Sequence, residues 1–191
     1  MNTGGEAHVI EFAWYALLSV WLVAAWKAKR PLRSQPPLPR LLHSILLLMA
    51  FALIFTPMMR FGILGQRFVP RSVAMDRAGT ALTLVGIAFA IWARLFLGTN
   101  WSAAPAVKQD HQLIRTGPYA IVRHPIYSGV LLAILGTALA TGEWRALLGL
   151  AVLSVAWHFK SRTEERYMEE EFGTEYLRYR RQVKALIPFL L

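Results

Sequence analysis

The residues best suited to chemistry lie between positions 111 and 129, in the stretch HQLIRTGPYAIVRHPIYSG. It holds two histidines, two arginines, two tyrosines and two prolines between apolar blocks. Each proline removes a backbone N–H donor and turns the preceding residue away from helical geometry. The segment is therefore predicted to be irregular. At membrane depth such backbone persists only where it is buried in protein or lines a polar cavity; an ordinary surface loop that contains proline is the alternative.

A second charged segment, Ser161 to Val183, follows the last apolar block. On a helix the adjacent Glu164 and Glu165 point about 100° apart, so that one can face a pocket while the other faces water or a basic neighbour. A merely solvated helix face, held by pairs such as Arg166 with Glu170, is the alternative. That alternative is weakest for Glu164, because this residue follows the last apolar block most closely.

The sequence contains neither G-x-G-x-x-G nor G-x-x-x-x-G-K-[ST], the two motifs of soluble nucleotide-binding folds. A cofactor would therefore have to be held by the polar segment and the helices around it. The chain has no cysteine, which excludes disulfides, thiolate nucleophiles and cysteine metal sites. Two histidines without further ligands predict no metal site.

The composition is that of a membrane protein. Of the 191 residues, 55% are hydrophobic and 17% are charged, whereas soluble domains have roughly 45–50% apolar and about 25% charged residues. The net charge of +10 could suggest nucleic acid. However, the lysines and arginines cluster in short segments between apolar blocks, and no module that reads nucleic acid is visible, so nucleic-acid binding is not expected.

Five apolar blocks are predicted to be helices: His8 to Trp26, about Leu41 to Met59, Ala78 to Gly98, Tyr127 to Ala140, and Trp144 to Phe159. The last two are shorter than the roughly 20 residues of a standard span and are joined by TGE, which predicts a tight hairpin. The tail, residues 160–184, is predicted to be a helix that breaks at Phe172-Gly173 and then resumes. The predicted fold class is all-α, an integral membrane protein with about five transmembrane helices and a cytoplasmic C-terminal helical tail.

Residues 1–98 are predicted to form three N-terminal transmembrane helices. Residues 99–191 would supply the cofactor-binding segment, the hairpin and an amphipathic tail, all within one structural domain. Small residues on the third helix would allow close contact with another helix: Gly79, Thr83, Gly86 and Ala90. Arg94, near the end of that helix, is expected to snorkel toward the membrane surface, the alternative being that it points into a polar pocket.

The distribution of basic residues predicts the orientation. Three segments that would share one side, Lys27–Arg40, Thr99–Ile126 and the tail, carry fifteen Lys and Arg, against five on the other side. Because basic residues are enriched in cytoplasmic loops, the polar segment and the tail are predicted to face the cytoplasm. Acidic residues stand where a signal peptide would be basic, so the first helix is expected to be retained with its N-terminus outside. The expected location is an inner or plasma membrane.

These residues also carry a resemblance to a known family. The combination of R-H-P-x-Y-x-G, an E-E pair about 35 residues later, F-G-x-x-Y-x-x-Y and I-P resembles the isoprenylcysteine carboxyl methyltransferase family and the related phospholipid methyltransferases. The similarity covers about residues 95–188, and the first three helices resemble the family only in being apolar. The resemblance implies a five-span membrane enzyme that binds S-adenosyl-L-methionine, releases S-adenosyl-L-homocysteine and methylates a lipophilic acceptor.

The resemblance further implies roles for individual residues. The cofactor contacts would fall on His111, Gln112, Leu113, Ile114, Tyr119, His124, Pro125, Ile126, Tyr127 and Glu164. The basic residue associated with the acceptor would be Arg162 or, in a shifted register, Lys160. Membrane lipids and a lipophilic small molecule or prenylated substrate would be its partners.

The chemistry of the residue types agrees with this assignment. Glu164 suits the cofactor's ammonium or ribose, and Tyr119 or Tyr127 could face a cation. His124 could bind the cofactor's carboxylate, or could be a packed, satisfied histidine. Transfer to a carboxylate needs positioning in a water-poor site, with Arg162 orienting the acceptor. A protonated amine acceptor would instead need a base, for which His124 or Glu165 could serve.

Two other function classes stay open on the sequence alone. Some sterol reductases resemble the C-terminal half and use NADPH in a similar pocket, but the 2′-phosphate of that cofactor would need further basic groups. A non-enzymatic membrane protein such as a transporter or scaffold is the third possibility, although the chain lacks an intramembrane acid relay and an internal repeat.

Overall fold

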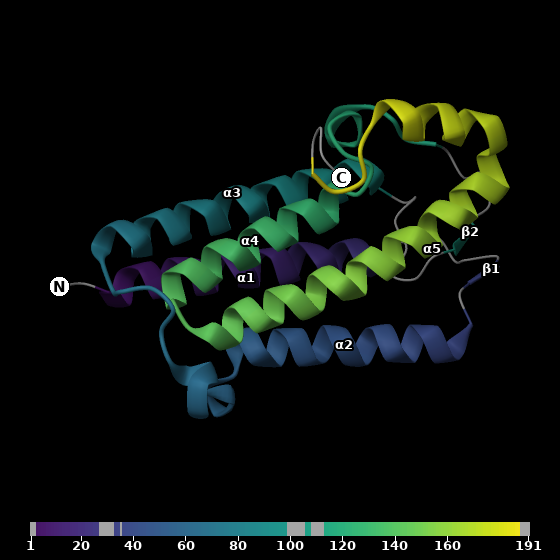
Figure 1. The fold of residues 1–191 in the computed structure, drawn as a ribbon. Helices are drawn as coiled ribbons and strands as arrows, with labels where there is room; N and C mark the ends of the chain where they lie inside the picture. Colours follow the sequence, from purple (N-terminus) through teal and green to yellow (C-terminus); the bar gives the residue numbers. More distant parts are fainter. Residues whose placement is uncertain (1–2, 27–32, 35, 99–105, 108–112, 188–191) are drawn as a thin grey trace.

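The computed structural model describes residues 3–26, 33–34, 36–98, 106–107 and 113–187. Five long helices form a bundle in this part of the chain (Figure 1): α1 Thr3–Trp26, α2 Pro37–Phe55, α3 Val73–Leu97, α4 Pro125–Thr141 and α5 Trp144–Gln182. The short elements are the 3-10 helices η1 Pro57–Met59, η2 Gly62–Gly65 and η4 Gly117–Ala120 and the strands β1 Arg33–Ser34 and β2 Ala106–Val107. The strands pair antiparallel, with Arg33 opposite Val107.

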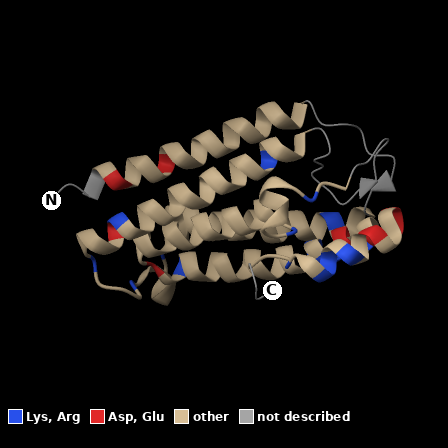
Figure 2. Ribbon diagram, turned by 90° about the horizontal axis from the view of Figure 1, so that it is seen from above, with Lys and Arg blue, Asp and Glu red and all other residues tan. Residues whose placement is uncertain are grey.

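The predicted all-α membrane fold is confirmed. Helices α1, α2 and α3 are each long and apolar enough to cross a membrane, and α4 is a shorter apolar helix. The predicted hairpin is formed by α4 and α5, which meet at Gly142 in the left-handed conformation. Charged side chains gather at the two ends of the bundle, and its middle is uncharged (Figure 2).

Several predicted boundaries were wrong. The first three helices begin earlier than predicted, at Thr3, Pro37 and Val73. The second helix ends at Phe55 rather than Met59, because Thr56 is extended before Pro57 and that proline starts η1. The tail is not a separate element either. Helix α5 continues without a break from the hairpin past Phe159, and its first departure from helical geometry is at Gly173. The charged segment is thus rigidly joined to the last apolar helix.

Successive helices run in opposite directions, which sorts the connections to the two ends of the bundle (Figure 1). The start of α2, the end of α3, η4 and the second half of α5 lie at one end, which is called the site end below. The start of α3 and the α4–α5 turn lie at the other. The described parts of the segments that the basic-residue count assigned to one side therefore lie at one end of the bundle.

The closest helix contact in the bundle is between α3 and α4. A Cβ added to Gly86 would lie only 2.4 Å from the backbone nitrogen of Ala133 and 2.5 Å from the carbonyl oxygen of Gly129. The buried Thr83 hydroxyl also donates across the interface to the Ala133 carbonyl oxygen, at 3.2 Å. Small residues promote such contact because apolar side chains gain little by leaving lipid for a helix interface. The small residues of the third helix therefore have α4 as their partner.

At the end opposite the site, Arg145 joins α5 to α2. Its guanidinium is 2% exposed and donates to the carbonyl oxygens of Leu53 at 2.7 Å and Ile54 at 2.8 Å. It also pairs with Glu143. The last carbonyls of a helix have no partner within the helix and carry its negative dipole end, so a cation there is stabilising. Arg145 thus fixes the separation of α2 and α5.

The expectation that Arg94 snorkels to the surface was wrong. Arg94 is 1% exposed, and its Nη1 donates to the carbonyl oxygen of Gly98 at 3.0 Å, within the C-terminal cap of α3. Helix η4 packs over this end of α3, and Gly117 lies against the ring of Phe96. Helix η4 therefore covers the end of α3 where water or lipid headgroups would otherwise contact Arg94.

The α3–α4 contact leads to the first prediction. Gly86→Val adds three carbons where backbone atoms already occupy the space, whereas Ala88→Ile adds three carbons on the exposed face of the same helix. Overpacking costs about 1–3 kcal/mol, so Gly86→Val should lower the Tm in detergent and Ala88→Ile should leave it near that of the parent. Equal melting temperatures for the two variants would contradict the packing.

Candidate active site

The polar segment has the irregular backbone that its prolines predict. Pro118 lies in the first turn of η4 and Pro125 in the first turn of α4, with His124 as the N-cap of α4 in a non-helical conformation. The segment is not an ordinary surface loop, since Pro118, Tyr119 and Pro125 are buried. Its prolines each lie at the start of a helix, and the non-helical backbone between η4 and α4 is available for contacts with another part of the chain.

The polar segment contacts the chain that follows the tail helix. The backbone N–H of Arg123 donates to the carbonyl oxygen of Lys184 at 2.8 Å, and that of His124 donates to Ala185 at 2.9 Å. The hydroxyl of Ser128 donates to the carbonyl oxygen of Leu186 at 2.5 Å. The loop before α4 and the chain after α5 are therefore joined by main-chain hydrogen bonds.

Gly173 allows the chain to turn back toward the polar segment. Its φ of 51° lies in the region that favours glycine, and the second part of α5 turns back over η4 there (Figure 1). Beyond the kink, the Tyr179 hydroxyl donates to the carbonyl oxygen of Tyr119 at 2.6 Å. Tyr176, which is also buried, follows the same turn. The break predicted at Phe172-Gly173 thus folds the tail onto the polar segment.

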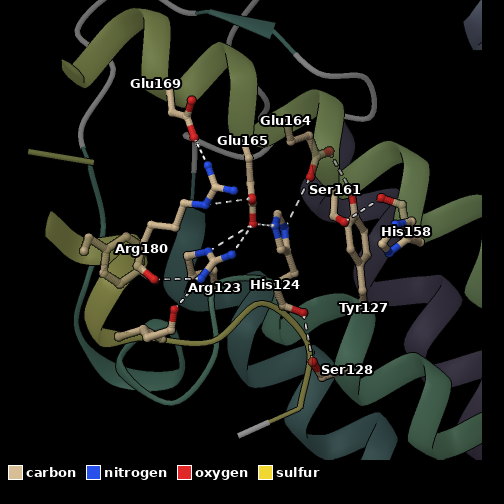
Figure 3. Close-up of polar contacts among 12 residues, drawn as sticks. Arg123, His124, Tyr127, Ser128, His158, Ser161, Glu164, Glu165, Glu169 and Arg180 are labelled. Carbon is tan, nitrogen blue, oxygen red and sulfur yellow. Dashed lines mark hydrogen bonds and ion pairs between the residues drawn. The ribbon is translucent and has the colours of Figure 1, made fainter. Parts of the chain in front are cut away.

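Glu165 is the centre of a buried ion-pair network (Figure 3). Its Oε1 accepts from Arg123 Nη2 at 2.6 Å and Nε at 3.0 Å and lies 3.2 Å from His124 Nε2, and Arg180 Nε is 3.6 Å from its Oε2. Burial would raise the pKa of Glu165, but the hydrogen bonds with His124 and Arg123 outweigh it and lower the pKa to about 2. Glu165 is therefore a fixed anion inside the protein.

Glu164 faces the opposite way and is held more loosely. Its Oε1 accepts from the Tyr127 hydroxyl at 2.7 Å, its Oε2 lies 3.6 Å from His124 Nδ1, and Lys160 Nζ is 3.9 Å from Oε1 (Figure 3). Burial would raise the pKa of Glu164, but the contacts with His124 and Lys160 lower it. Glu164 thus stays anionic while keeping capacity for another donor.

His124 lies between the two glutamates. Burial would lower the pKa of His124, but its hydrogen bonds with Glu164 and Glu165 outweigh that effect and raise it. The ring therefore tends to keep its proton and to donate from both nitrogens. A histidine in this state bridges two carboxylates and is a poor proton acceptor.

Three stacked rings continue from His124 into the apolar region. The His124 and Tyr127 rings lie 5.5 Å apart at 6°, and the Tyr127 and Trp157 rings lie 4.8 Å apart at 20°. The ammonium of Lys160 lies 5.4 Å from the centre of the Tyr127 ring. Aromatic faces attract cations, so this column offers a surface for a positively charged ligand beside Glu164.

A cavity of about 1560 Å³ meets these groups and continues between the helices. Pockets for small molecules are usually about 300–1,000 Å³, so this one has room for more than one ligand. In its middle the walls include apolar side chains of α1 and α2, among them Trp14, Leu17, Trp21, Leu47 and Phe51. Charged residues line it again at the end opposite the site, including Arg67, Asp76 and Glu143. The cavity thus has an apolar middle between two charged ends.

Eight of the ten residues predicted to contact a cofactor line this cavity: Leu113, Ile114, Tyr119, His124, Pro125, Ile126, Tyr127 and Glu164. The other two, His111 and Gln112, lie outside the described residues. Within the described chain the structure therefore brings the predicted set together around one space.

The two residues predicted to act on the acceptor lie elsewhere. Arg162 is exposed and, together with Glu165, borders a separate small depression on the other side of α5. Lys160, the alternative to Arg162, lines the main cavity. Glu164 and Lys160 are four residues apart and so share a helix face, from which Arg162 is turned away.

Several lining residues were missed. Trp157, Tyr167 and Met168 share the helix face of Glu164, and that spacing could have identified them from the sequence. Tyr176 lines the cavity because of the kink at Gly173, and no local signal pointed to it. His43 lines it because α2 packs against α5; the signal that could have identified it is that it is the one ionisable residue in an apolar stretch.

The chain is similar to known proteins over the same region. The phospholipid methyltransferase family model matches residues 75–175, more than half of the chain. The protein-S-isoprenylcysteine O-methyltransferase of Schizosaccharomyces pombe is 32% identical over 77% of this chain and 55% of its own length. That of Saccharomyces cerevisiae is 37% identical over 44% of this chain and 35% of its own. A cobalt-zinc-cadmium resistance protein of Cupriavidus metallidurans is 29% identical over 66% of this chain and 53% of its own.

The fold is also similar to that of a solved structure, the eukaryotic intramembrane Ras methyltransferase named isoprenylcysteine carboxyl methyltransferase. The TM-score is 0.53 with 24% identity, over 77% of this chain and 52% of that one. This chain spans about half the length, or less, of these curated relatives. The matched region contains α4, most of α3 and α5 up to the kink, together with Glu164, His124 and Tyr127. The chain is an integral membrane protein that belongs to the phospholipid methyltransferase family, within which it is similar to isoprenylcysteine carboxyl methyltransferases.

Proposed function

We propose that this protein is an S-adenosylmethionine-dependent methyltransferase that methylates the carboxylate of a lipophilic acceptor such as an isoprenylcysteine. One observation carries the proposal: the anionic Glu164 stands beside stacked rings at the site end of a cavity whose middle is lined by apolar side chains of α1 and α2. That arrangement fits a cationic ligand at the site end and a long apolar chain along the middle of the cavity.

The cofactor would be held by Glu164 and the aromatic column. Glu164 would accept from the methionine ammonium, and the faces of Tyr127 and Trp157 would lie near the sulfonium. The non-helical backbone at Leu113 and Ile114, with His111 and Gln112 before it, would supply polar groups for the adenine. When bound, the cofactor supplies a methyl group whose S–C bond breaks, with its electron pair left on sulfur, as an O–C bond to the acceptor forms.

Lys160 would hold the acceptor's carboxylate in place of Arg162, because Lys160 lines the cavity. In the free protein Lys160 is paired with Glu164 at 3.9 Å, a long contact compared with the 2.7 Å hydrogen bond from Tyr127. A cationic cofactor can therefore pair with Glu164, and an anionic acceptor with Lys160. Both charges are lost in the reaction, which a water-poor site favours.

The surroundings of the two candidate bases favour a carboxylate acceptor over an amine. A protonated amine would have to lose a proton to a base. However, His124 donates to both glutamates and its pKa is raised, and the pKa of Glu165 is lowered to about 2 by His124 and Arg123 against the effect of burial. A carboxylate needs no proton removed, so positioning by the chain is sufficient. Glu165 would then be a positioning residue that holds Arg123 and His124.

The site would face the cytoplasm, where the cofactor is made. The support is the fifteen-to-five distribution of basic residues, with the richer segments at the site end of the bundle (Figure 2).

The adjacent glutamates should respond differently to the same substitution. Glu164→Gln removes a charge-assisted contact to the cofactor, which is worth about ten- to a hundredfold in affinity, and should change the Tm little. Calorimetry with S-adenosylmethionine measures the affinity, and Glu171→Gln on the exposed face is the control. Unchanged affinity in Glu164→Gln would show that the tail does not take part in the pocket.

Glu165→Gln should instead destabilise the fold. It leaves the buried Arg123 without its carboxylate, and breaking a buried pair costs roughly 3–5 kcal/mol. Because the pKa of Glu165 is lowered on folding, its stabilisation is present above its unfolded pKa of about 4.3 and is lost as the pH falls toward 2. The Tm difference between parent and variant should therefore be large at neutral pH and shrink in acid. A difference independent of pH would argue against an ionised Glu165.

Lys160 and Arg162 can be separated by one matched pair of variants. Lys160→Met should raise the KM for an S-farnesyl cysteine by about tenfold or more, because it removes a charged donor to the acceptor. Arg162→Met should leave KM and kcat near the parent values, since Arg162 is exposed outside the cavity. The opposite result would restore the assignment made from the sequence.

The orientation can be tested with single cysteines, since the chain has none. Gln66 and Thr174 are both exposed and lie at opposite ends of the bundle. A membrane-impermeant thiol reagent added to intact cells should label Gln66→Cys and spare Thr174→Cys until the membrane is opened. Labelling of Thr174→Cys alone would place the site on the outer face.

A further inference from the structure

His43 is the only ionisable residue between Leu41 and Phe55, in a helix that is otherwise apolar there. Ionisable residues within membrane helices are costly and mark functional positions more often than chance would give. His43 lines the cavity, as do Leu47 and Phe51, which follow it at four-residue intervals on the same helix face. The helix thus contributes one ionisable side chain, that of His43, to a part of the cavity that Leu47 and Phe51 make apolar.

The position of His43 relates it to the charged end of the site. Lys160 and Glu164 of α5 line the same cavity as His43, and α2 packs against α5 along the bundle. Among the described residues, its nitrogens make no hydrogen bond or ion pair at the distances found for His124. A ring nitrogen of His43 is therefore available to a ligand that also meets Lys160.

We propose that His43 binds the acceptor, its ring N–H donating to one carboxylate oxygen while Lys160 holds the other. This inference rests on the proposed function and names a residue of the acceptor site outside residues 75–175, which the family model matches. Two donors from different helices fix the plane of a carboxylate, which a single flexible lysine cannot do. Fixing that plane directs the attacking oxygen toward the methyl group, and such orientation is a large part of catalysis by proximity.

The location of His43 also bears on which acceptor the protein selects. The family model begins at residue 75, so Glu164, Tyr127 and Lys160 lie inside the matched region and His43 lies outside it. The proposed cofactor contact Glu164 thus lies within the part of the chain that the family model matches, and the contact from α2 lies outside it. His43 is accordingly a specificity residue for an acceptor with an anionic head and an apolar chain.

The test uses the full-length protein in detergent or lipid, with an S-farnesyl cysteine as the acceptor. His43→Phe keeps a ring in an apolar helix but removes the donor, and His43→Gln keeps a donor. His43→Phe should raise the acceptor KM about tenfold or more, with kcat and the Kd for S-adenosylmethionine nearly unchanged. His43→Gln should return the KM close to the parent value. Leu42→Phe is the control, because it adds a ring next to His43 at an exposed position outside the cavity.

Each other outcome overturns the inference in a distinct way. An unchanged KM in His43→Phe means that His43 does not touch the acceptor. A fall in kcat with an altered pH profile and unchanged KM means that it acts as a base. A weaker Kd for S-adenosylmethionine means that it supports the cofactor half or the packing. If the parent protein itself bound no S-adenosylmethionine, the proposed function would fail first and this inference with it.

Discussion

The site depends on the buried ion pair between Glu165 and Arg123. The same guanidinium that holds Glu165 at 2.6 Å also donates to the carbonyl oxygens of Arg180 and Val183. One interaction thereby joins the loop before α4, the middle of α5 and the chain after the kink. Removing one partner of such a pair leaves an uncompensated charge, which is why the pair fixes the arrangement more than it adds net stability.

With Glu165 occupied in this way, its neighbour becomes the functional group. The turn of the helix directs Glu164 into the cavity, where a hydroxyl, an imidazole and an ammonium surround it at 2.7 to 3.9 Å. His124 connects the two carboxylates, so the structural pair also orients the group that faces the ligand. The proposed division into a cofactor half and an acceptor half follows from the contact between Glu164 and Lys160. When ligands bind, Glu164 would pair with the cofactor and Lys160 with the acceptor instead of with each other.

The sequence was most informative where the cause of a structure is local. The prolines predicted the irregular segment, Gly173 the break in the tail, and the spacing of small residues a close helix contact. It was least informative where position depends on packing between distant elements. Whether Lys160 or Arg162 faces the cavity is decided by how α5 is rotated, and Arg145, donating to the end of α2, holds those two helices together. Arg94 was misjudged because η4, distant in sequence, covers it.

The most direct test of the account is calorimetric titration of the purified parent protein with S-adenosylmethionine, S-adenosylhomocysteine and NADPH. The account predicts that the first two bind at one site per chain and compete with each other, while NADPH gives no heat of binding. The charged end of the cavity presents Glu164, which suits an ammonium and opposes a phosphate. Binding of NADPH without binding of S-adenosylmethionine would contradict the account and favour a reductase.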